Sequence, residues 1–86
     1  MTTAVATDIR EFVQRKHRVS ELEDSTDIFA LGFINSLFAM QLVLFLENRF
    51  GIRIPNDELV LDNLRTVTAM TGLVERQLAT VTRSAP

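Results

Sequence analysis

Apolar residues recur at helical spacing in three stretches of the chain, separated by polar segments. The first stripe, with the i, i+4, i+7, i+8 spacing of one helix face, consists of Val5, Ile9, Phe12 and Val13. We expect this helix to begin after Thr2 or Thr3, whose hydroxyls are suited to capping, and to end in the basic cluster at 15–18. Cations in the last turn are favoured by the negative end of the helix dipole, and this is how we interpret His17.

The second stretch, over residues 35–50, is the strongest helix candidate. Asn35 is a favourable N-cap residue, and Gly51 is a natural left-handed residue after the last turn. The preceding segment, residues 19–34, is rich in Ser, Asp and Glu, which is typical of a long loop. We expect three apolar residues to attach this loop to the core: Ile28, Phe29 and Leu31.

After the second helix, the pattern predicts a short helix and a final long one. The segment "IRIP" is expected to be extended, and Pro55 is placed to open a short third helix through residues 55–61. Thr66 is the expected cap of the final helix, whose apolar stripe consists of Val67, Met70, Val74 and Leu78. The chain is therefore predicted to be an all-α bundle of three main helices plus one short helix, with a long first loop. We place the domain at residues 1–80 and a disordered C-terminal tail at 81–86.

The second helix is apolar nearly all round when it is projected at about 100° per residue. Its expected core face consists of Ala39, Leu42, Val43, Leu46 and Phe50, with Met40 at the edge. The opposite arc consists of Leu37, Phe38, Leu44 and Phe45, interrupted by Gln41 and Asn48. Such a helix is either fully enclosed or used for contact. Full enclosure is hard to arrange in 86 residues, so we predict a partner-docking face on this arc. The alternative is that the long loop and the third helix cover it.

The composition excludes several kinds of function. The chain has no Cys, so it forms neither disulfides nor a thiolate metal site, and the acidic residues between 21 and 27 are too scattered to indicate a metal site. The formal charge is −2 and the basic cluster is short, so we expect no binding to nucleic acid. No apolar run reaches the length of about 18 residues that indicates a membrane span, and the first residues lack the pattern of a signal peptide. We therefore expect a cytoplasmic monomer without membrane association.

Ser36 stands at the start of the second helix, in the apolar run "LGFINSLFAM", and three roles are open to it. A hydrolytic nucleophile needs a base, but His17 is the only histidine and no "GxSxG" turn surrounds the serine. A capping role is redundant beside Asn35. The third role is that of an attachment point, because the exposed N–H groups and the positive dipole at a helix start favour a phosphate group. The position suits a phosphodiester.

The run "DIFALGFINSLFAMQLVLFLENRFGIRIP", followed by "LDNLRTVTAM", resembles the acyl carrier proteins. The family pattern is a loop with an apolar anchor, a glycine, Asp-Ser-Leu at the start of helix two and an "FGI.IP" segment after it. The matching residues are Phe29, Gly32, Asn35, Ser36, Leu37, Phe50, Gly51, Ile52, Ile54 and Pro55. The resemblance extends over nearly the whole chain and implies a four-helix bundle of the acyl-carrier type.

The resemblance also implies what the site holds. A phosphopantetheinyl transferase, using coenzyme A and magnesium, would attach 4′-phosphopantetheine to Ser36, with Asn35 and Leu37 beside the cofactor. The thiol of this arm would carry an acyl group as a thioester, so the chain would be a carrier protein without catalytic activity of its own. Ile54 and Leu61 are expected to border a shallow cavity for the acyl chain, with core packing as the alternative.

Two departures from the family pattern bear on the partners. Asn35 replaces the usual Asp, which keeps the capping oxygen but removes a charge close to the phosphate and the transferase. Helix two has Glu47 as its only acid, so partner enzymes should bind it more by apolar contact than by opposite charge. The predicted docking residues are Phe33, Leu37, Phe38, Gln41, Leu44, Phe45 and Ile54.

The segment "GFINSLFAMQLVLFLE" is similar to discrete carriers that build unusual polyketide extender units, such as hydroxymalonyl or methoxymalonyl thioesters from a glyceryl starter. This similarity implies a dedicated pathway of polyketide or antibiotic biosynthesis. The implied partners are acyl-loading enzymes, acyl-modifying enzymes of the dehydrogenase type, and acyltransferases or synthases. The alternatives are a peptidyl or D-alanyl carrier protein, or an unmodified helical adaptor.

Overall fold

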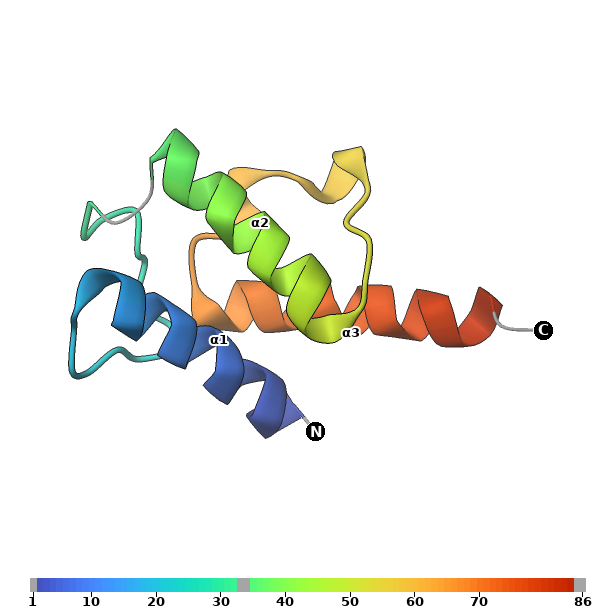
Figure 1. Ribbon diagram of the computed structural model, residues 1–86, viewed down its shortest axis with the longest axis horizontal. Helices are drawn as coiled ribbons and strands as arrows, with labels where there is room; N and C mark the ends of the chain where they lie inside the picture. Colours follow the sequence, from blue (N-terminus) through green and yellow to red (C-terminus); the bar gives the residue numbers. More distant parts are fainter. Residues whose placement is uncertain (1, 33–34, 85–86) are drawn as a thin grey trace.

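The computed structural model describes residues 2–32 and 35–84, with side chains described for 4–32 and 35–79, and its helices form one bundle (Figure 1). The elements in chain order are α1 (Thr2–His17), α2 (Ser36–Phe50), η1 (Asn56–Glu58), η2 (Leu61–Asn63) and α3 (Val67–Ser84). The two η elements are single 3₁₀ turns, and no strand occurs among the described residues. The predicted all-α bundle of three main helices with a long first loop is confirmed.

The end of α2 and the start of α3 lie where short-range capping chemistry places them, whereas α1 already begins at Thr2 and so includes the Thr2 and Thr3 that were expected to cap it. Gly51 follows α2 in the left-handed conformation with φ of 65°, as the sequence predicts. Thr66 caps α3, since its Oγ1 accepts the Ala69 N–H at 2.9 Å. At its other end α3 continues to Ser84, past the domain boundary expected at residue 80, because no Gly or Pro interrupts the helix there.

The connection between α2 and α3 differs from the single short helix predicted over residues 55–61. It contains two separate 3₁₀ turns, η1 and η2, with extended backbone at Val60 between them. The Glu58 N–H bonds to the Pro55 carbonyl at 2.9 Å and the Leu64 N–H to the Leu61 carbonyl at 2.9 Å, both in the i to i+3 pattern. Apolar side chains at Leu59, Val60 and Leu61 remain exposed, so no buried stripe extends the first turn into a longer helix.

The core lies between the three α-helices and contains the apolar stripes predicted for α1 and α3. Its fully buried side chains are Ile9, Val13, Ile28, Leu42, Leu46, Val67, Met70, Leu73 and Val74. α1 packs against α3, and α2 crosses α3 (Figure 1). The first turn of α2 lies at the edge of the bundle, away from both chain ends (Figure 1).

The long first loop is attached to the core through Ile28. The side chain of Ile28 is fully buried, and its N–H bonds to the Arg65 carbonyl at 2.8 Å. Phe29 is half-buried beneath the Arg65 guanidinium, 5.3 Å from the ring centroid. The expectation that Leu31 also anchors the loop is wrong, since its side chain is 51% exposed. Gly32 follows with φ of 76°, in the left-handed region that favours glycine.

Candidate functional site

The start of α2 is built by Asn35, as the sequence predicts. Asn35 has extended backbone, and its side-chain Oδ1 accepts the Phe38 N–H at 2.8 Å. Its carbonyl accepts the Ala39 N–H at 2.8 Å, which closes the first turn. Ser36 is therefore the first residue of α2, and its side chain is exposed. The cap makes a second capping hydroxyl unnecessary, so the Ser36 hydroxyl lies at the positive end of the helix with no structural task there.

A shallow pocket of about 310 Å³ lies beside Ser36. Its wall is mostly apolar and is formed by Phe29 from the long loop, Ala39 from α2 and Leu61 from η2. Leu61 thus occupies the position that the sequence predicts at the edge of a cavity. Ile54, the other residue predicted there, is 6% exposed and belongs to the core. The pocket can receive an apolar part of a group attached to the neighbouring hydroxyl.

The burial of Ile54 also corrects its assignment as a docking residue. Glu47 causes this burial, since its Oε2 accepts the Ile54 N–H at 3.0 Å and its carbonyl accepts the Ile52 N–H at 3.1 Å. The segment after Gly51 is thereby fixed against the end of α2, with Ile52 and Ile54 both buried. The Glu47 carboxylate, which accepts this N–H, is half-buried and is not presented to a partner.

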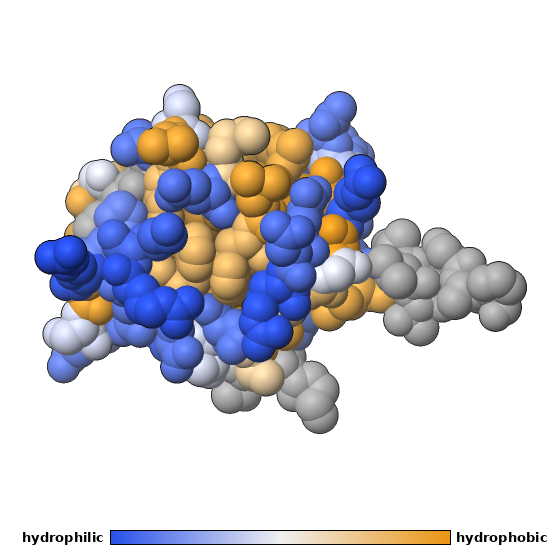
Figure 2. All heavy atoms as spheres, in the orientation of Figure 1, coloured by the Kyte–Doolittle hydropathy of each residue, from blue (hydrophilic) through white to orange (hydrophobic). Residues whose placement is uncertain are grey.

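Three apolar side chains on α2 are exposed and form the outer stripe, which we define as Leu37, Met40 and Leu44. Their exposed fractions are 69%, 59% and 52%. Exposure of Leu37 and Leu44 agrees with the predicted docking arc, whereas Met40 was expected at the edge of the core. Apolar side chains also gather on the face that carries α2 in Figure 2. The outer stripe begins directly beside Ser36 and runs along two turns of the helix.

Phe38 was predicted on the exposed docking arc, and this prediction is wrong. Its side chain is 5% exposed and lies in the core. The ring is stacked parallel to Phe12 of α1 at a centroid distance of 6.1 Å, and His17 meets it edge-on at 4.4 Å. The end of α1 therefore covers this side of α2, which a projection of α2 alone does not reveal.

The remaining predicted docking residues with described side chains are half-buried at the edge of the core. Phe45 is half-buried against Phe12, with the rings stacked at 4.1 Å, and Gln41 is half-buried. Phe33 lies outside the described residues. The signal that sequence reasoning missed is the buried series at i, i+4 and i+8, formed by Phe38, Leu42 and Leu46.

His17 is half-buried at the end of α1, where its ring packs against Phe38, rather than exposed as expected for a cation at the helix end. Burial lowers the pKa of His17 below its ordinary value of 6.5, because desolvation penalises the imidazolium. The edge-on contact with Phe38 holds the His17 ring at the boundary of the core. A general-base role toward Ser36 has no support in this arrangement.

The described residues also bear on metals and membranes. No group of three or more His, Asp or Glu side chains in the described part of the chain is arranged to hold a metal ion. Among the helices with described residues, none has the length and apolar character needed to cross a membrane.

Comparison with known proteins identifies the family to which this chain belongs. The sequence matches the family described as "Phosphopantetheine attachment site" over residues 7–74. Similar curated proteins include the D-alanyl carrier proteins of Streptococcus pyogenes strains Manfredo and NZ131. Each is 39% identical to this chain over 57 residues, which cover 66% of this chain and 71% of the relative. No solved structure matches the chain.

Proposed function

The chain belongs to the phosphopantetheine-attachment family of carrier proteins, and on this basis we propose that it is a discrete acyl carrier whose arm is attached to Ser36. The cofactor of this family is covalently bound 4′-phosphopantetheine, derived from coenzyme A. The observation that supports Ser36 is its exposed side chain at the first residue of α2, next to the Asn35 cap. The apolar pocket beside it, bordered by Leu61, fits a group attached at this hydroxyl.

The chemistry divides between the arm and the protein. When bound, the arm supplies a thiol that holds an acyl group as a thioester, a function that a chain without Cys has no side chain to perform. The protein supplies the Ser36 oxygen, which forms a phosphodiester while adenosine 3′,5′-bisphosphate leaves coenzyme A. The positive end of α2 stabilises the resulting phosphate charge. Members of this family generally have no catalytic activity of their own, and the proton of Ser36 passes to the phosphopantetheinyl transferase.

The acyl group that we propose is a polyketide extender unit, made from a glyceryl starter toward a hydroxymalonyl or methoxymalonyl thioester. The outer stripe supports recognition by dedicated enzymes, because its exposed side chains are apolar. An acidic surface in this position would instead suit partners with a basic binding site. Glu47, the only acid of α2, is bound to the Ile54 N–H and adds little to such a surface. The partners would be an acyl-loading enzyme, a dehydrogenase-type enzyme and an acyltransferase or synthase.

A second candidate is a D-alanyl carrier. The similarity to D-alanyl carrier proteins, at 39% identity, favours it. In that case the same arm on Ser36 would hold an amino acid in place of the three-carbon hydroxy acid. The site itself is compatible with both, because the group is held at the end of the arm and not in a deep pocket of this chain.

Intact-mass spectrometry tests attachment. Incubation of the full chain with a phosphopantetheinyl transferase, coenzyme A and magnesium should add the mass of one phosphopantetheine group. Ser36→Ala should abolish the addition, and Ser25→Ala, a matched change at an exposed loop serine, should leave it intact. Wild-type protein that stays unmodified with several transferases would indicate an unmodified helical adaptor, and modification of the Ser36→Ala variant would refute the assignment.

Loading of the modified protein then distinguishes the two candidate functions, the extender-unit carrier and the D-alanyl carrier. The holo protein is offered to a glyceryl-loading enzyme and, separately, to a D-alanine-activating ligase with ATP, and the mass of each product is measured. Preferential glyceryl loading supports the extender-unit carrier. Preferential D-alanine loading replaces it with the second candidate and leaves the Ser36 attachment unaffected.

A further inference from the structure

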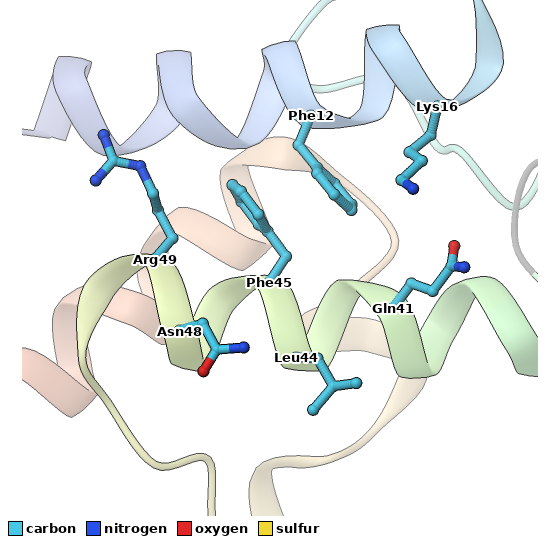
Figure 3. A pocket seen from close by; sticks show the side chains of 7 residues that line it. All are labelled: Phe12, Lys16, Gln41, Leu44, Phe45, Asn48 and Arg49. Carbon is cyan, nitrogen blue, oxygen red and sulfur yellow. The ribbon is translucent and has the colours of Figure 1, made fainter.

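A second surface, between α1 and α2, is hollowed into an open groove of about 480 Å³. Its floor is aromatic, because Phe12 from α1 and Phe45 from α2 point toward each other across the groove and stack at 4.1 Å (Figure 3). The two rings lie between the helices, and Leu44 continues the apolar surface outward. None of these residues lines the pocket beside Ser36. The groove is therefore a separate feature of the molecule.

The charged side chains that line the groove are both cations, and Asp8 at one end neutralises one of them, Arg49. Lys16 reaches from α1 toward Gln41 of α2 at one end (Figure 3), with its Nζ 5.7 Å from the centroid of the Phe12 ring. Arg49 lies at the other end, where it pairs with Asp8 at 2.7 Å. Lys16 and Arg49 line the groove, and no Asp or Glu among the described residues does. This local excess of cations contrasts with the formal charge of −2 of the whole chain.

The residues of α2 that line the groove belong to one face of the helix. They include positions i, i+3, i+4 and i+7, beginning at Gln41 and ending at Asn48. This series extends for about 10 Å, two turns of a helix laid alongside. The groove is open along its length and floored by apolar rings, which suits an amphipathic helix better than a small enclosed ligand.

We propose that this groove docks an amphipathic helix of a partner protein, with the apolar ridge of that helix on Phe45 and Leu44 and a carboxylate facing Lys16. The proposal builds on the carrier function, since such a partner would be held beside the helix that presents the arm. In carriers with an acidic helix two, the carrier supplies the negative charges and the partner the positive ones. Here the arrangement is reversed, because the cations belong to the carrier. The choice of an acidic partner rests on the charges that line the groove.

Nuclear magnetic resonance titration of the full-length ¹⁵N-labelled protein tests this surface without knowledge of the natural partner. The probes are two synthetic helical peptides of about 15 residues. Both have leucines at i, i+3, i+4 and i+7, and they differ only in having glutamates or lysines beside that ridge. We expect the glutamate peptide to shift the amide signals of Phe12, Lys16 and Asn48, and to bind more tightly than the lysine peptide.

Charge reversal gives the decisive variant. Lys16→Glu should weaken binding of the glutamate peptide by about three- to tenfold, because an attraction at the rim becomes a repulsion. Arg53→Glu is the matched control, because Arg53 is an exposed cation that does not line the groove, and it should change the affinity less than twofold. Leu44→Gln should also weaken binding, whereas Leu59→Gln, at an exposed leucine outside the groove, should not.

Several results would overturn the proposal. Equal affinity for the two peptides would refute the role of the cations, and shifts confined to Leu37 and Leu61 would place docking elsewhere. Signals of the groove that shift with protein concentration alone would identify a second copy of the chain as the occupant. Modification of Ser36 is measured by intact mass in wild type and in the Lys16→Glu variant, so that the two proposals remain distinguishable. Absence of modification in wild type refutes the carrier function, and absence of peptide selectivity in wild type refutes the groove.

Discussion

Replacing Asn35 with alanine removes the acceptor that the Phe38 N–H uses at the start of α2. The bond between Asn35 Oδ1 and this N–H is 2.8 Å long, and it fixes the first turn of the helix that begins with Ser36. Loss of an N-cap of this type costs about 1 kcal/mol of the free energy of unfolding, within a range of roughly 0.5 to 2. In a domain of this size we therefore expect the Tm to fall by about 4 to 8 °C per kcal/mol lost.

Asn35→Asp keeps the shape and the acceptor oxygen of the side chain and changes only its charge. Aspartate keeps an acceptor oxygen and adds a negative charge at the positive end of α2, which should stabilise the helix by about 0.3 to 1 kcal/mol where the charge is exposed. The unfolding free energies should therefore rank Asp at or above Asn, and both above Ala. Asn48→Ala provides the control, because Asn48 is exposed inside the same helix and alanine has the higher helix propensity.

Thermal and urea unfolding followed by far-ultraviolet circular dichroism measure these differences. If Asn35→Ala unfolds like wild type, the side-chain cap contributes nothing and the geometry at the helix start has been misjudged. If Asn35→Asp is as unstable as Asn35→Ala, the capping bond is not what holds the first turn. A fall in stability of Asn48→Ala equal to that of Asn35→Ala would mean that the effect is general to α2.

Two further predictions concern the contact between α1 and α2. Phe38→Ala should lower the urea-derived free energy of unfolding by about 3 to 5 kcal/mol, because the ring is buried against Phe12. Leu37→Ala, at a side chain that is 69% exposed, should change it by less than about 0.5 kcal/mol. Equal losses would contradict the assigned burial. The pKa of His17 is lowered in the folded state, so on acidification the unfolded state takes up a proton near pH 6.5 before the folded state does. The free energy of unfolding should therefore fall as the pH drops below 6.5 through the folded pKa. His17→Gln should flatten this part of the pH profile, and an unchanged slope would assign it to other groups.

The features that sequence analysis predicted correctly are those set by neighbouring residues. The caps at Asn35 and Thr66 and the left-handed Gly51 depend on side-chain and backbone bonds within one turn. Such bonds follow from residue type and short spacing, so they can be read from the sequence. The position of Ser36 as the first residue of α2 follows from the cap and requires no knowledge of the rest of the fold.

The buried face of α2 was predicted less well because it depends on contacts across the bundle. A helix that is apolar nearly all round has no unique face in its own periodicity. The choice is made by Phe12 and His17 of α1, which cover Phe38, while no described contact covers Met40 to the same degree. The burial of Ile54 has a similar origin, since it follows from the bond that Glu47 makes to its N–H.

The apolar character of α2 has more than one physical consequence in a chain this small. The core encloses Leu42 and Leu46, yet Leu37 and Leu44 remain more than half exposed. Transfer of exposed apolar side chains out of water is favourable, so a row of them along one helix favours association with another surface. Because the outer stripe starts beside Ser36, a partner that covers it would also be brought to the proposed attachment site. The apolar residues that made the fold of α2 ambiguous in sequence are therefore the residues on which selective contact with enzymes would depend.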